Sequence, residues 1–310
     1  MKRKILIIGG SSLLSLNFVF FLKKKFSLYL ACNSQKPKIP SAESFFINFN
    51  KINEIKKKIN IINPDIIFLS AALTNIEYCE KYKKKAYKVN YLLNKNIVDL
   101  VKNKPIKIIF ISSDQVYCGN KTFSKEKDRR FSLNYYTKLK ILSENYIIKN
   151  FKNSLIIRTN FFGYGPNFRM SFSDKIINDF KEKKEINYFK DVFFTPIYMP
   201  IFFRVLVSLI NQNISGIFNL CSPDKISKYG FAKKIFELFK FDKNFLKSGF
   251  IKEKALLVNR PLDMSMSFAK VSRYINFTIP KLNNQIIKMK NDYQSNYYFF
   301  MKKIKLIKKY

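Results

Sequence analysis

Tyr136 and Lys140 are the two residues of this sequence whose types and spacing best suit acid–base chemistry. The chain has no histidine, so proton transfer must fall to Tyr, Lys, Ser, Asp or Glu, and histidine-dependent hydrolase and metalloprotease mechanisms are excluded. Residues four positions apart share one face of a helix, where a lysine cation lowers the pKa of a neighbouring phenol from about 10. Tyr136 would then donate a proton to an alkoxide formed by hydride transfer.

The surrounding sequence, and not the spacing alone, selects Tyr136. The pattern Tyr-x-x-x-Lys occurs five times, beginning at Tyr91, Tyr117, Tyr136, Tyr229 and Tyr298. Upstream of Tyr136, residues 109–114 have a buried-strand pattern that ends in hydroxyl side chains, and ligands bind at such strand ends in α/β folds. We therefore expect Ser113 to hydrogen-bond a substrate carbonyl and to orient it towards Tyr136.

A turn rich in glycine and serine, residues 9–15, follows the first apolar strand pattern and precedes a helical one. Gly9, Ser12 and Ser15 have the spacing of a dinucleotide-binding turn, with serine in place of the second and third glycines. Backbone N–H groups at the start of the following helix would cradle a phosphate. A generic strand–helix turn explains the same residues equally well.

The segment after the second strand pattern bears on the choice of cofactor. Residues 32–36 read Cys-Asn-Ser-Gln-Lys and offer no acidic side chain to hold a ribose 2′-hydroxyl. Ser34 and Lys36 are instead suited to neutralise a 2′-phosphate. The sequence thus favours NADPH, with NADH as the alternative.

These residues are predicted to lie on a doubly wound α/β fold of the Rossmann type. Continuous apolar strand patterns (residues 5–8, 27–31, 66–70, 107–112 and 154–158) alternate with helical patterns (12–24, 50–62, 77–102 and 134–152). Beyond Arg158 the pattern loosens. We expect an NAD(P)-binding domain over residues 1–160, to which 191–215 return. A smaller C-terminal substrate-binding lobe over 161–280 would cover the carboxyl edge of the sheet, followed by a basic, partly helical tail over 281–310.

The net charge of +37 does not by itself indicate a nucleic-acid partner. Only eight of the 58 basic residues are arginine, and the abundance of Ile, Asn, Phe and Tyr beside 8 Gly and 10 Pro is typical of AT-rich codon usage. Proteins that recognise nucleic acids favour arginine and cluster their charge. The dispersed lysines indicate solvated surfaces, so no specific nucleic-acid partner is expected.

Neither long apolar stretch is interpreted as a membrane span. Residues 5–22 are interrupted by a Gly-Gly-Ser-Ser turn and Asn17, and residues 192–210 by two prolines and Arg204. The four cysteines are scattered and never form a CxxC pair, which argues against a disulfide scaffold or a zinc site. We expect a cytoplasmic protein without a bound metal, and the sequence leaves a homodimer open.

Over roughly residues 4–270 the sequence resembles the extended short-chain dehydrogenases/reductases, and among them the dTDP-4-dehydrorhamnose reductases. The resemblance rests on the order and spacing of short motifs. They are GGSS (9–12), PDIIFLSAA (64–72), TNIEYCE (74–80), VN (89–90), ISSDQVYCG (111–119), LNYY (133–136) with Lys140 and Glu144, IRT (157–159), TPIY (195–198), GIFN (216–219), SKY (227–229) and RPL (260–262).

This resemblance implies roles for individual residues. Tyr136 matches the family's acid, Lys140 its lysine, and Ser113 a position usually held by threonine. Cofactor contacts are implied at Gly9, Ser11, Ser12, Leu13, Leu14, Asn33, Ser34, Lys36, Ala71, Ala72, Tyr136 and Lys140. Substrate contacts are implied at Thr74, Arg158, Asn160 and Arg260.

Asn90 matches a residue that supports the fold beside the cofactor, and Arg260 an arginine of the nucleotide-sugar lobe. The Arg-Pro pair at Arg260 is equally compatible with a structural turn. Two departures from the family pattern are the serines of the glycine turn and Cys118, where an acid is common.

The function implied is the NADPH-dependent reduction of a 4-keto nucleotide sugar in cell-surface polysaccharide synthesis. One alternative is a nucleotide-sugar epimerase of the same fold, which retains its NAD. Another is a non-catalytic NAD(P)-binding subunit that resembles the β subunit of methionine adenosyltransferase, which the degenerate glycine turn favours. We expect removal of residues 291–310 to leave the reduction largely intact.

Overall fold

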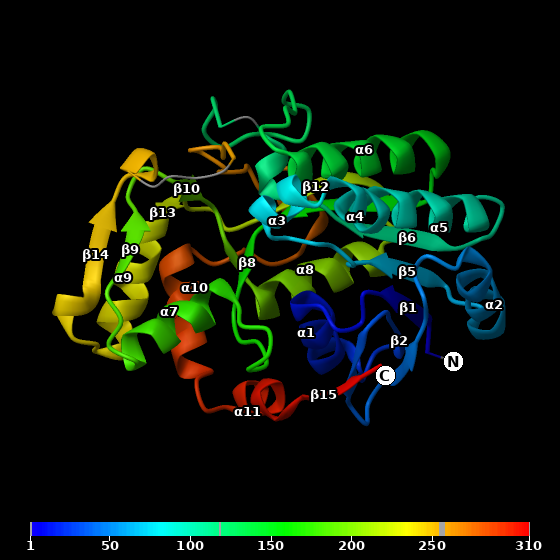
Figure 1. Ribbon diagram of the computed structural model, residues 1–310, viewed down its shortest axis with the longest axis horizontal. Coiled ribbons are helices and arrows are strands. Elements are labelled where there is room, and N and C mark those ends of the chain that lie inside the picture. The colour runs from blue at the N-terminus through cyan, green and yellow to red at the C-terminus, as the bar shows by residue number, and fades with distance from the viewer. Residues whose placement is uncertain (1, 118, 254–257, 310) are drawn as a thin grey trace.

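In the computed structural model, which describes residues 2–117, 119–253 and 258–309, seven parallel strands form the central sheet (Figure 1). Their spatial order is β4 (Glu43–Phe46), β2 (Ser27–Cys32), β1 (Lys4–Ile8), β5 (Ile66–Leu69), β6 (Lys107–Ile111), β7 (Ser154–Thr159) and β12 (Gly216–Leu220). The direction of strand addition reverses between β1 and β5. In open α/β sheets such a switch point marks the crevice where ligands bind.

Helices cover both faces of the sheet because successive side chains of each buried strand point to opposite sides. Ile5 and Ile7 of β1 join the core beneath α1 (Leu13–Leu22) and α8 (Met199–Asn211). Leu6 and Ile8 join the core beneath α2 (Ile52–Ile62), α5 (Leu93–Val101) and α6 (Tyr135–Asn150). The prediction of a doubly wound Rossmann-type fold is confirmed.

The segment predicted as one helix over residues 77–102 is divided. It contains α3 (Ile76–Lys81), α4 (Lys83–Tyr87), a π-helical turn (Lys88–Leu92) and then α5. Tyr82 leaves the helical region, with φ −115° and ψ 56°, and so separates α3 from α4. Sequence periodicity does not reveal such breaks, nor that the apolar residues of α3 and α4 pack on α6 while those of α5 pack on the sheet.

A smaller lobe covers one end of the sheet (left in Figure 1). It contains α7 (Phe172–Lys181), α9 (Lys228–Phe239) and the parallel pair β9 (Ile186–Phe189) and β14 (Leu246–Gly249). Two-residue strands link it to the sheet: β8 (Phe161–Phe162) with β11 (Ile197–Tyr198), and β10 (Phe193–Phe194) with β13 (Ile226–Ser227). Short 3-10 turns span Asp114–Val116, Lys243–Phe245, Ile251–Glu253 and Val271–Tyr274. None of the helices within the described ranges is long and apolar enough to cross a membrane.

The C-terminal segment returns to the N-terminal half of the molecule (Figure 1). After α10 (Leu282–Asn291) it forms α11 (Asn296–Lys303), which packs against α1, and β15 (Lys305–Lys308), which pairs antiparallel with β3 (Gln35–Lys38). Tyr297 is 5% exposed, and its hydroxyl donates to Asn17 Oδ1 of α1 at 2.5 Å. Met301 is fully buried. Removal of residues 291–310, expected to leave the reduction largely intact, would uncover part of the core around α1.

Candidate active site

The turn at Gly9 joins β1 to α1 at the switch point of the sheet. Gly9 has φ +95°, and a Cβ at this position would lie 2.6 Å from the backbone nitrogen of Ala71, which follows β5. A Cβ at Gly10 would lie 2.6 Å from the Leu30 Cβ. Only glycine permits both the backbone angle at Gly9 and these approaches. The bare backbone between two strand ends forms the cradle that a dinucleotide requires.

Serine hydroxyl groups stabilise this turn in place of the missing glycines. Ser12 caps α1 by accepting the Ser15 N–H at 3.2 Å. The Ser15 hydroxyl lies 3.0 Å from the Gly9 carbonyl, to which it donates, and 2.7 Å from Ser70 Oγ at the end of β5. Ser15 is fully buried, so its side chain does not obstruct the crevice. Sequence comparison with a glycine pattern could not reveal this network, because Ser70 lies on another strand.

The helix N-terminus beside the turn fits a phosphate group. The N–H groups of the first helical turn, which begins at Leu13, have no intrahelical partners. The side chain of Leu14 is buried in the core, so this residue offers only its backbone. Ser11 and Leu13 are half-buried at the edge of the crevice.

The residues predicted to select the cofactor follow β2. Cys32, the last residue of the strand, is 1% exposed and adjoins no acidic residue in the segment 33–38. Asn33 Oδ1 accepts the Phe49 N–H at 3.3 Å, which ties the ends of β2 and β4 together. Ser34 is exposed, and the Lys36 ammonium lies 5.1 Å from the centroid of the Phe46 ring.

The opposite wall of the crevice is the segment after β5, which includes Ala71 and Ala72. Asn90, in the π-helical turn, holds this segment at Leu73, the residue after Ala72. The Asn90 amide donates to the Leu73 carbonyl at 2.9 Å and accepts the Leu73 N–H at 2.8 Å. This two-bond clamp gives Asn90 a positioning role for the backbone that lines the crevice.

The structure brings Ser113, Tyr136 and Lys140 together at the carboxyl end of β6. Ser113 begins the 3-10 turn after the strand, and its side chain lies close enough to the Tyr136 hydroxyl to influence its pKa. The Lys140 ammonium donates to the Ile111 carbonyl at 2.7 Å and lies 5.9 Å from the Tyr136 ring centroid. All three side chains are less than 8% exposed. The arrangement can polarise a carbonyl and deliver a proton to it.

Burial dominates the protonation of this group. It raises the pKa of Tyr136 well above 10, and the nearby Ser113 side chain opposes the rise only in part. Burial also lowers the pKa of Lys140 to about 8. The expected lowering of the Tyr136 pKa by Lys140 is not found, because the Lys140 ammonium is directed at the Ile111 carbonyl. Tyr136 is therefore protonated at neutral pH, as an acid in a reduction must be.

The buried carboxylate of Asp114 contacts Ser113. Asp114 Oδ1 accepts the Ser113 hydroxyl at 3.1 Å, and Oδ2 accepts the Asn160 amide at 2.8 Å. Burial raises the pKa of Asp114, and the Lys228 ammonium opposes the rise. Burial lowers the pKa of Lys228 itself to about 8. Asn160 thus orients Asp114 as well as facing the cleft.

The cleft beside Ser113 has a volume of about 660 Å³ and lies between the sheet edge and the smaller lobe. Of the residues predicted to contact substrate, it brings together Thr74, Asn160 and Arg260. Arg260 is paired with Glu77 through one terminal nitrogen, while its buried Nε has no hydrogen-bond partner among the described residues. The further lining includes Lys175, Tyr188 and Lys228. Basic and aromatic side chains of this kind suit an anionic, ring-containing ligand.

Gln115 lines the cleft, although no role for it was predicted. Its N–H donates to Ser113 Oγ at 3.2 Å, and its buried Oε1 has no hydrogen-bond partner within the described part of the chain. A buried amide oxygen in this position is suited to accept a hydrogen bond from a ligand hydroxyl. Its place two residues after Ser113, in the same strand-end turn, was the available signal.

Arg158 does not reach the cleft, which corrects the expectation of a substrate contact. It is fully buried on the α6 side of β7, where its Nη2 lies 2.7 Å from Glu144 Oε2 and its Nη1 donates to the Tyr117 hydroxyl at 2.7 Å. A third bond ends on the Glu126 carbonyl. The sequence indicates that Arg158 lies on a strand, but not which face of the sheet it occupies.

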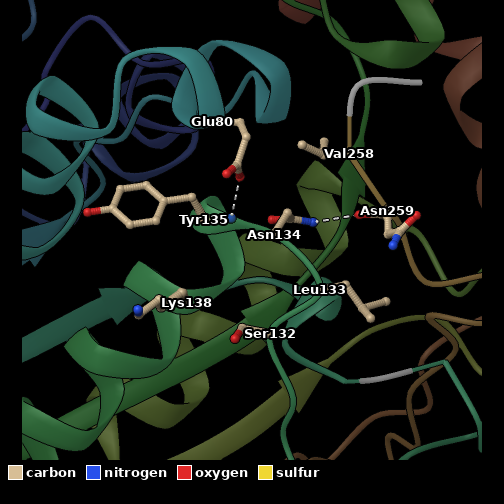
Figure 2. A pocket seen from close by; sticks show the side chains of 8 residues that line it. All are labelled: Glu80, Ser132, Leu133, Asn134, Tyr135, Lys138, Val258 and Asn259. Carbon is tan, nitrogen blue, oxygen red and sulfur yellow. Dashed lines mark hydrogen bonds between the residues drawn. The ribbon is translucent and has the colours of Figure 1, made fainter. Parts of the chain in front are cut away.

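A second hollow, of about 420 Å³, lies at the start of α6 (Figure 2). The Glu80 carboxylate accepts the Tyr135 N–H at 3.0 Å, and the Asn134 amide donates to the Asn259 carbonyl at 3.1 Å. These contacts fix the first turn of the helix that carries Tyr136. They also hold the segment that precedes Arg260. The contacts around this hollow therefore help to position both Tyr136 and Arg260.

The charge of Lys140 predicts a pH dependence. Lys140 is needed as a cation and loses its proton as the pH rises through about 8. We therefore expect kcat/KM to be level near neutral pH and to fall about tenfold per pH unit well above 8. Because the Tyr136 pKa is raised, Tyr136 does not titrate in this range.

Steady-state rates across this range test the assignment. Lys228 has a similarly lowered pKa and is the control. The decline should persist in Lys228→Met and move to higher pH in Lys140→Arg. A decline that disappears in Lys228→Met would assign it to the cleft lysine instead.

Comparison with known proteins agrees with this geometry. Residues 3–295 match the family described as the RmlD substrate binding domain. A spore coat polysaccharide biosynthesis protein of Bacillus subtilis is 26% identical over 236 residues, which cover 76% of this chain and 78% of that protein. A probable low-salt glycan biosynthesis reductase of Haloferax volcanii is 22% identical over 239 residues, 74% of this chain and 79% of that protein.

Solved structures share the fold over nearly the whole chain. A hypothetical dTDP-4-dehydrorhamnose reductase from Sulfolobus tokodaii superposes with a TM-score of 0.79 at 26% identity, covering 91% of this chain and 97% of that one. The dTDP-4-dehydrorhamnose reductase of Bacillus anthracis in complex with NADP gives 0.78 at 21% identity, covering 93% and 99%. Since the family match includes the glycine turn, the group at Tyr136 and the cleft, the resemblance found in the sequence is confirmed, and the chain belongs to the RmlD substrate binding domain family of extended short-chain dehydrogenases/reductases.

Proposed function

We propose that this protein reduces the 4-keto group of a nucleotide sugar with NADPH, in the synthesis of a cell-surface polysaccharide. One observation carries the proposal: Ser113, Tyr136 and Lys140 meet at the carboxyl end of β6, the strand beside β5, and Gln115 of the same strand end lines the cleft that contains Arg260. A cofactor in the crevice and a sugar in the cleft would therefore meet at Tyr136.

Family membership makes the chain an NAD(P)-dependent oxidoreductase of nucleotide sugars, as the sequence predicted. The related Bacillus subtilis and Haloferax volcanii proteins are named for polysaccharide and glycan biosynthesis, and the latter is called a reductase. The choice of a 4-keto sugar and of NADPH is our proposal. It is supported by the NADP complex of the Bacillus anthracis enzyme and by the absence of an acidic residue in segment 33–38. We place the reaction in the cytoplasm.

The residues present fit a dinucleotide, since the glycine turn brings bare backbone to the N-terminus of α1 at the switch point of the sheet. Gly9, Ser12 and the start of α1 would hold its pyrophosphate, Ser34 and Lys36 its 2′-phosphate, and Ala71 and Ala72 would line its path. When bound, the cofactor supplies the hydride.

The chain's own residues then control the carbonyl and its proton. The Ser113 hydroxyl, held in place by the Gln115 N–H, would turn its hydrogen from Asp114 Oδ1 to the sugar carbonyl oxygen and so polarise it. Tyr136, protonated because of its burial, donates its proton to that oxygen as negative charge develops there. The Lys140 ammonium, anchored on the Ile111 carbonyl, would hold the nicotinamide ribose of the bound cofactor. Correct placement of these groups supplies most of the acceleration.

The surplus of positive charge assists an anionic substrate. With a net charge of +37 the protein attracts nucleoside diphosphate sugars over long distances. Association of the substrate with the protein is therefore expected to slow as salt is added. Lys175, Lys228 and Arg260 provide local positive charge in the cleft itself.

Oxidation of NADPH in the presence of candidate 4-keto nucleotide sugars tests the proposal. We expect consumption of NADPH with at least one such sugar, none without sugar, and little with the corresponding free sugar, which lacks the diphosphate. Consumption that does not depend on the sugar, or that is equal with a simple ketone, would contradict it.

A further inference from the structure

The last strand of the chain lies along the segment that follows β2. The family match ends at residue 295, so α11 and β15 lie beyond it. Strand β15 pairs antiparallel with β3, with Lys305 opposite Lys38 and Ile307 opposite Lys36. The Lys309 N–H donates to the Ser34 carbonyl at 3.0 Å, which continues the ladder by one residue. The chain thus runs towards the carboxyl end of β2, where the residues predicted to select the cofactor lie.

The register places Lys309 beside those residues. Residues opposite each other in an antiparallel pair share a face, as do residues two apart on one strand. Ser34, Lys36 and Lys309 therefore share one face of the ribbon formed by β3 and β15. On that side Lys36 lies against Phe46, and Lys309 lies close enough to Glu54, near the start of α2, to help lower its pKa.

Helix α11 anchors this strand firmly. Besides Tyr297 and Met301 in the core, Lys302 donates to the Gly165 carbonyl at 2.9 Å and to Asp174 Oδ1 at 3.0 Å. Leu306 of β15 packs on the same side as the buried Pro37 of β3. These contacts of α11 and β15 thus hold Lys309 in a defined position.

The lysines of this ribbon form no close ion pair, although the Glu54 carboxylate lies near Lys309. Lys36, Lys308 and Lys309 form no ion pair with any side chain in the described ranges, and Lys308 and Lys309 are exposed. Like charges brought together across an antiparallel ladder repel each other. A phosphate placed between Lys36 and Lys309 would relieve this repulsion and form charge-assisted hydrogen bonds.

We propose that the C-terminal strand completes the cofactor site and that Lys309, together with Ser34 and Lys36, binds the 2′-phosphate of NADPH. The proposal deepens the proposed function and rests on it. Lys309 is then a residue that determines cofactor specificity, although it lies outside the part of the chain that the family shares. Lys308, on the other face of the ribbon, contributes to the field without contact.

Calorimetric titration of the full-length protein with NADPH and NADH tests this directly. In Lys309→Ala we expect the affinity for NADPH to fall about tenfold and that for NADH to change less than twofold, because only NADPH carries the 2′-phosphate. Adenosine 2′,5′-bisphosphate and AMP, as fragments, should show the same contrast. The matched control is Lys305→Ala, an exposed lysine on the same face of β15 but at its far end, which should alter neither affinity.

The outcomes separate this proposal from the proposed function. An unchanged NADPH affinity in Lys309→Ala, or an equal loss for NADPH and NADH, would overturn the role of Lys309. Lys309→Glu, which adds repulsion, should weaken NADPH binding further and guards against compensation by neighbouring lysines. If the unaltered protein binds NADPH selectively but reduces no keto sugar, the proposed function fails while the binding result still decides this inference.

Discussion

Replacing Tyr136 with phenylalanine is expected to lower kcat by about 10²-fold or more while cofactor affinity and thermal stability stay near those of the unaltered protein. The change removes one hydroxyl group from a ring that packs in its own small cluster with Leu139 and Cys79. In the proposed mechanism that hydroxyl, which lies near Ser113, is the acid that protonates the sugar oxygen. Single-turnover rates, with NADPH affinity measured separately, would assign the loss to the chemical step.

Two other tyrosines provide matched controls. Tyr91, in the π-helical turn, and Tyr229, in α9, begin the same Tyr-x-x-x-Lys pattern but are half-buried, whereas Tyr136 is buried. Phenylalanine at either position should change kcat less than twofold. A control as damaging as Tyr136→Phe would show that the active site has been misplaced.

Replacing Arg158 with methionine is expected to lower the free energy of unfolding by about 3–5 kcal/mol. The change leaves the Glu144 carboxylate, which is itself fully buried, with only Ser112 and the partly exposed Arg130 as partners. Chemical denaturation would measure the loss. Substrate KM in the remaining folded protein should change little, because Arg158 is remote from the cleft.

Arg260→Met should give the opposite result. Arg260 lies in the cleft, and its side chain is about a third exposed, so stability should change by less than about 1 kcal/mol. Loss of a charged contact to the nucleotide should raise KM about tenfold or more. A large KM effect from Arg158→Met at unchanged stability, with none from Arg260→Met, would reverse these two assignments.

The sheet could be predicted because burial on both faces leaves a direct trace in the sequence. The patterns at residues 5–8, 27–31, 66–70, 107–112 and 154–158 each fall on a strand of the structure, since strands buried on both faces read as continuous apolar runs. Strand β4, with exposed Glu43, and the edge strand β12 lack such a run and were missed. A sheet edge needs fewer apolar residues, so its sequence signal is weaker.

Parts of the site depended on contacts that periodicity cannot convey. The proximity of Ser113 and Tyr136 was predictable, because the end of a strand and the start of the following helix lie at one edge of a parallel sheet. The direction of the Lys140 ammonium, the face occupied by Arg158 and the pairing of β15 with β3 depend on which side chains meet across the fold. The last of these joins residues separated by almost the whole chain, and the lysine-rich sequence there resembles a solvated tail.

The fate of deuterium from NADPH labelled on the nicotinamide ring tests the central claim most directly. If the protein reduces a 4-keto nucleotide sugar, the label should appear at carbon 4 of the product, one deuterium per NADPH consumed, and free NADP should accumulate. Mass spectrometry and NMR of the isolated sugar nucleotide would locate it. An isomerised sugar without label and without net NADPH consumption would indicate an epimerase, and tight NADPH binding without any turnover would indicate a non-catalytic subunit; either result would contradict the reductase.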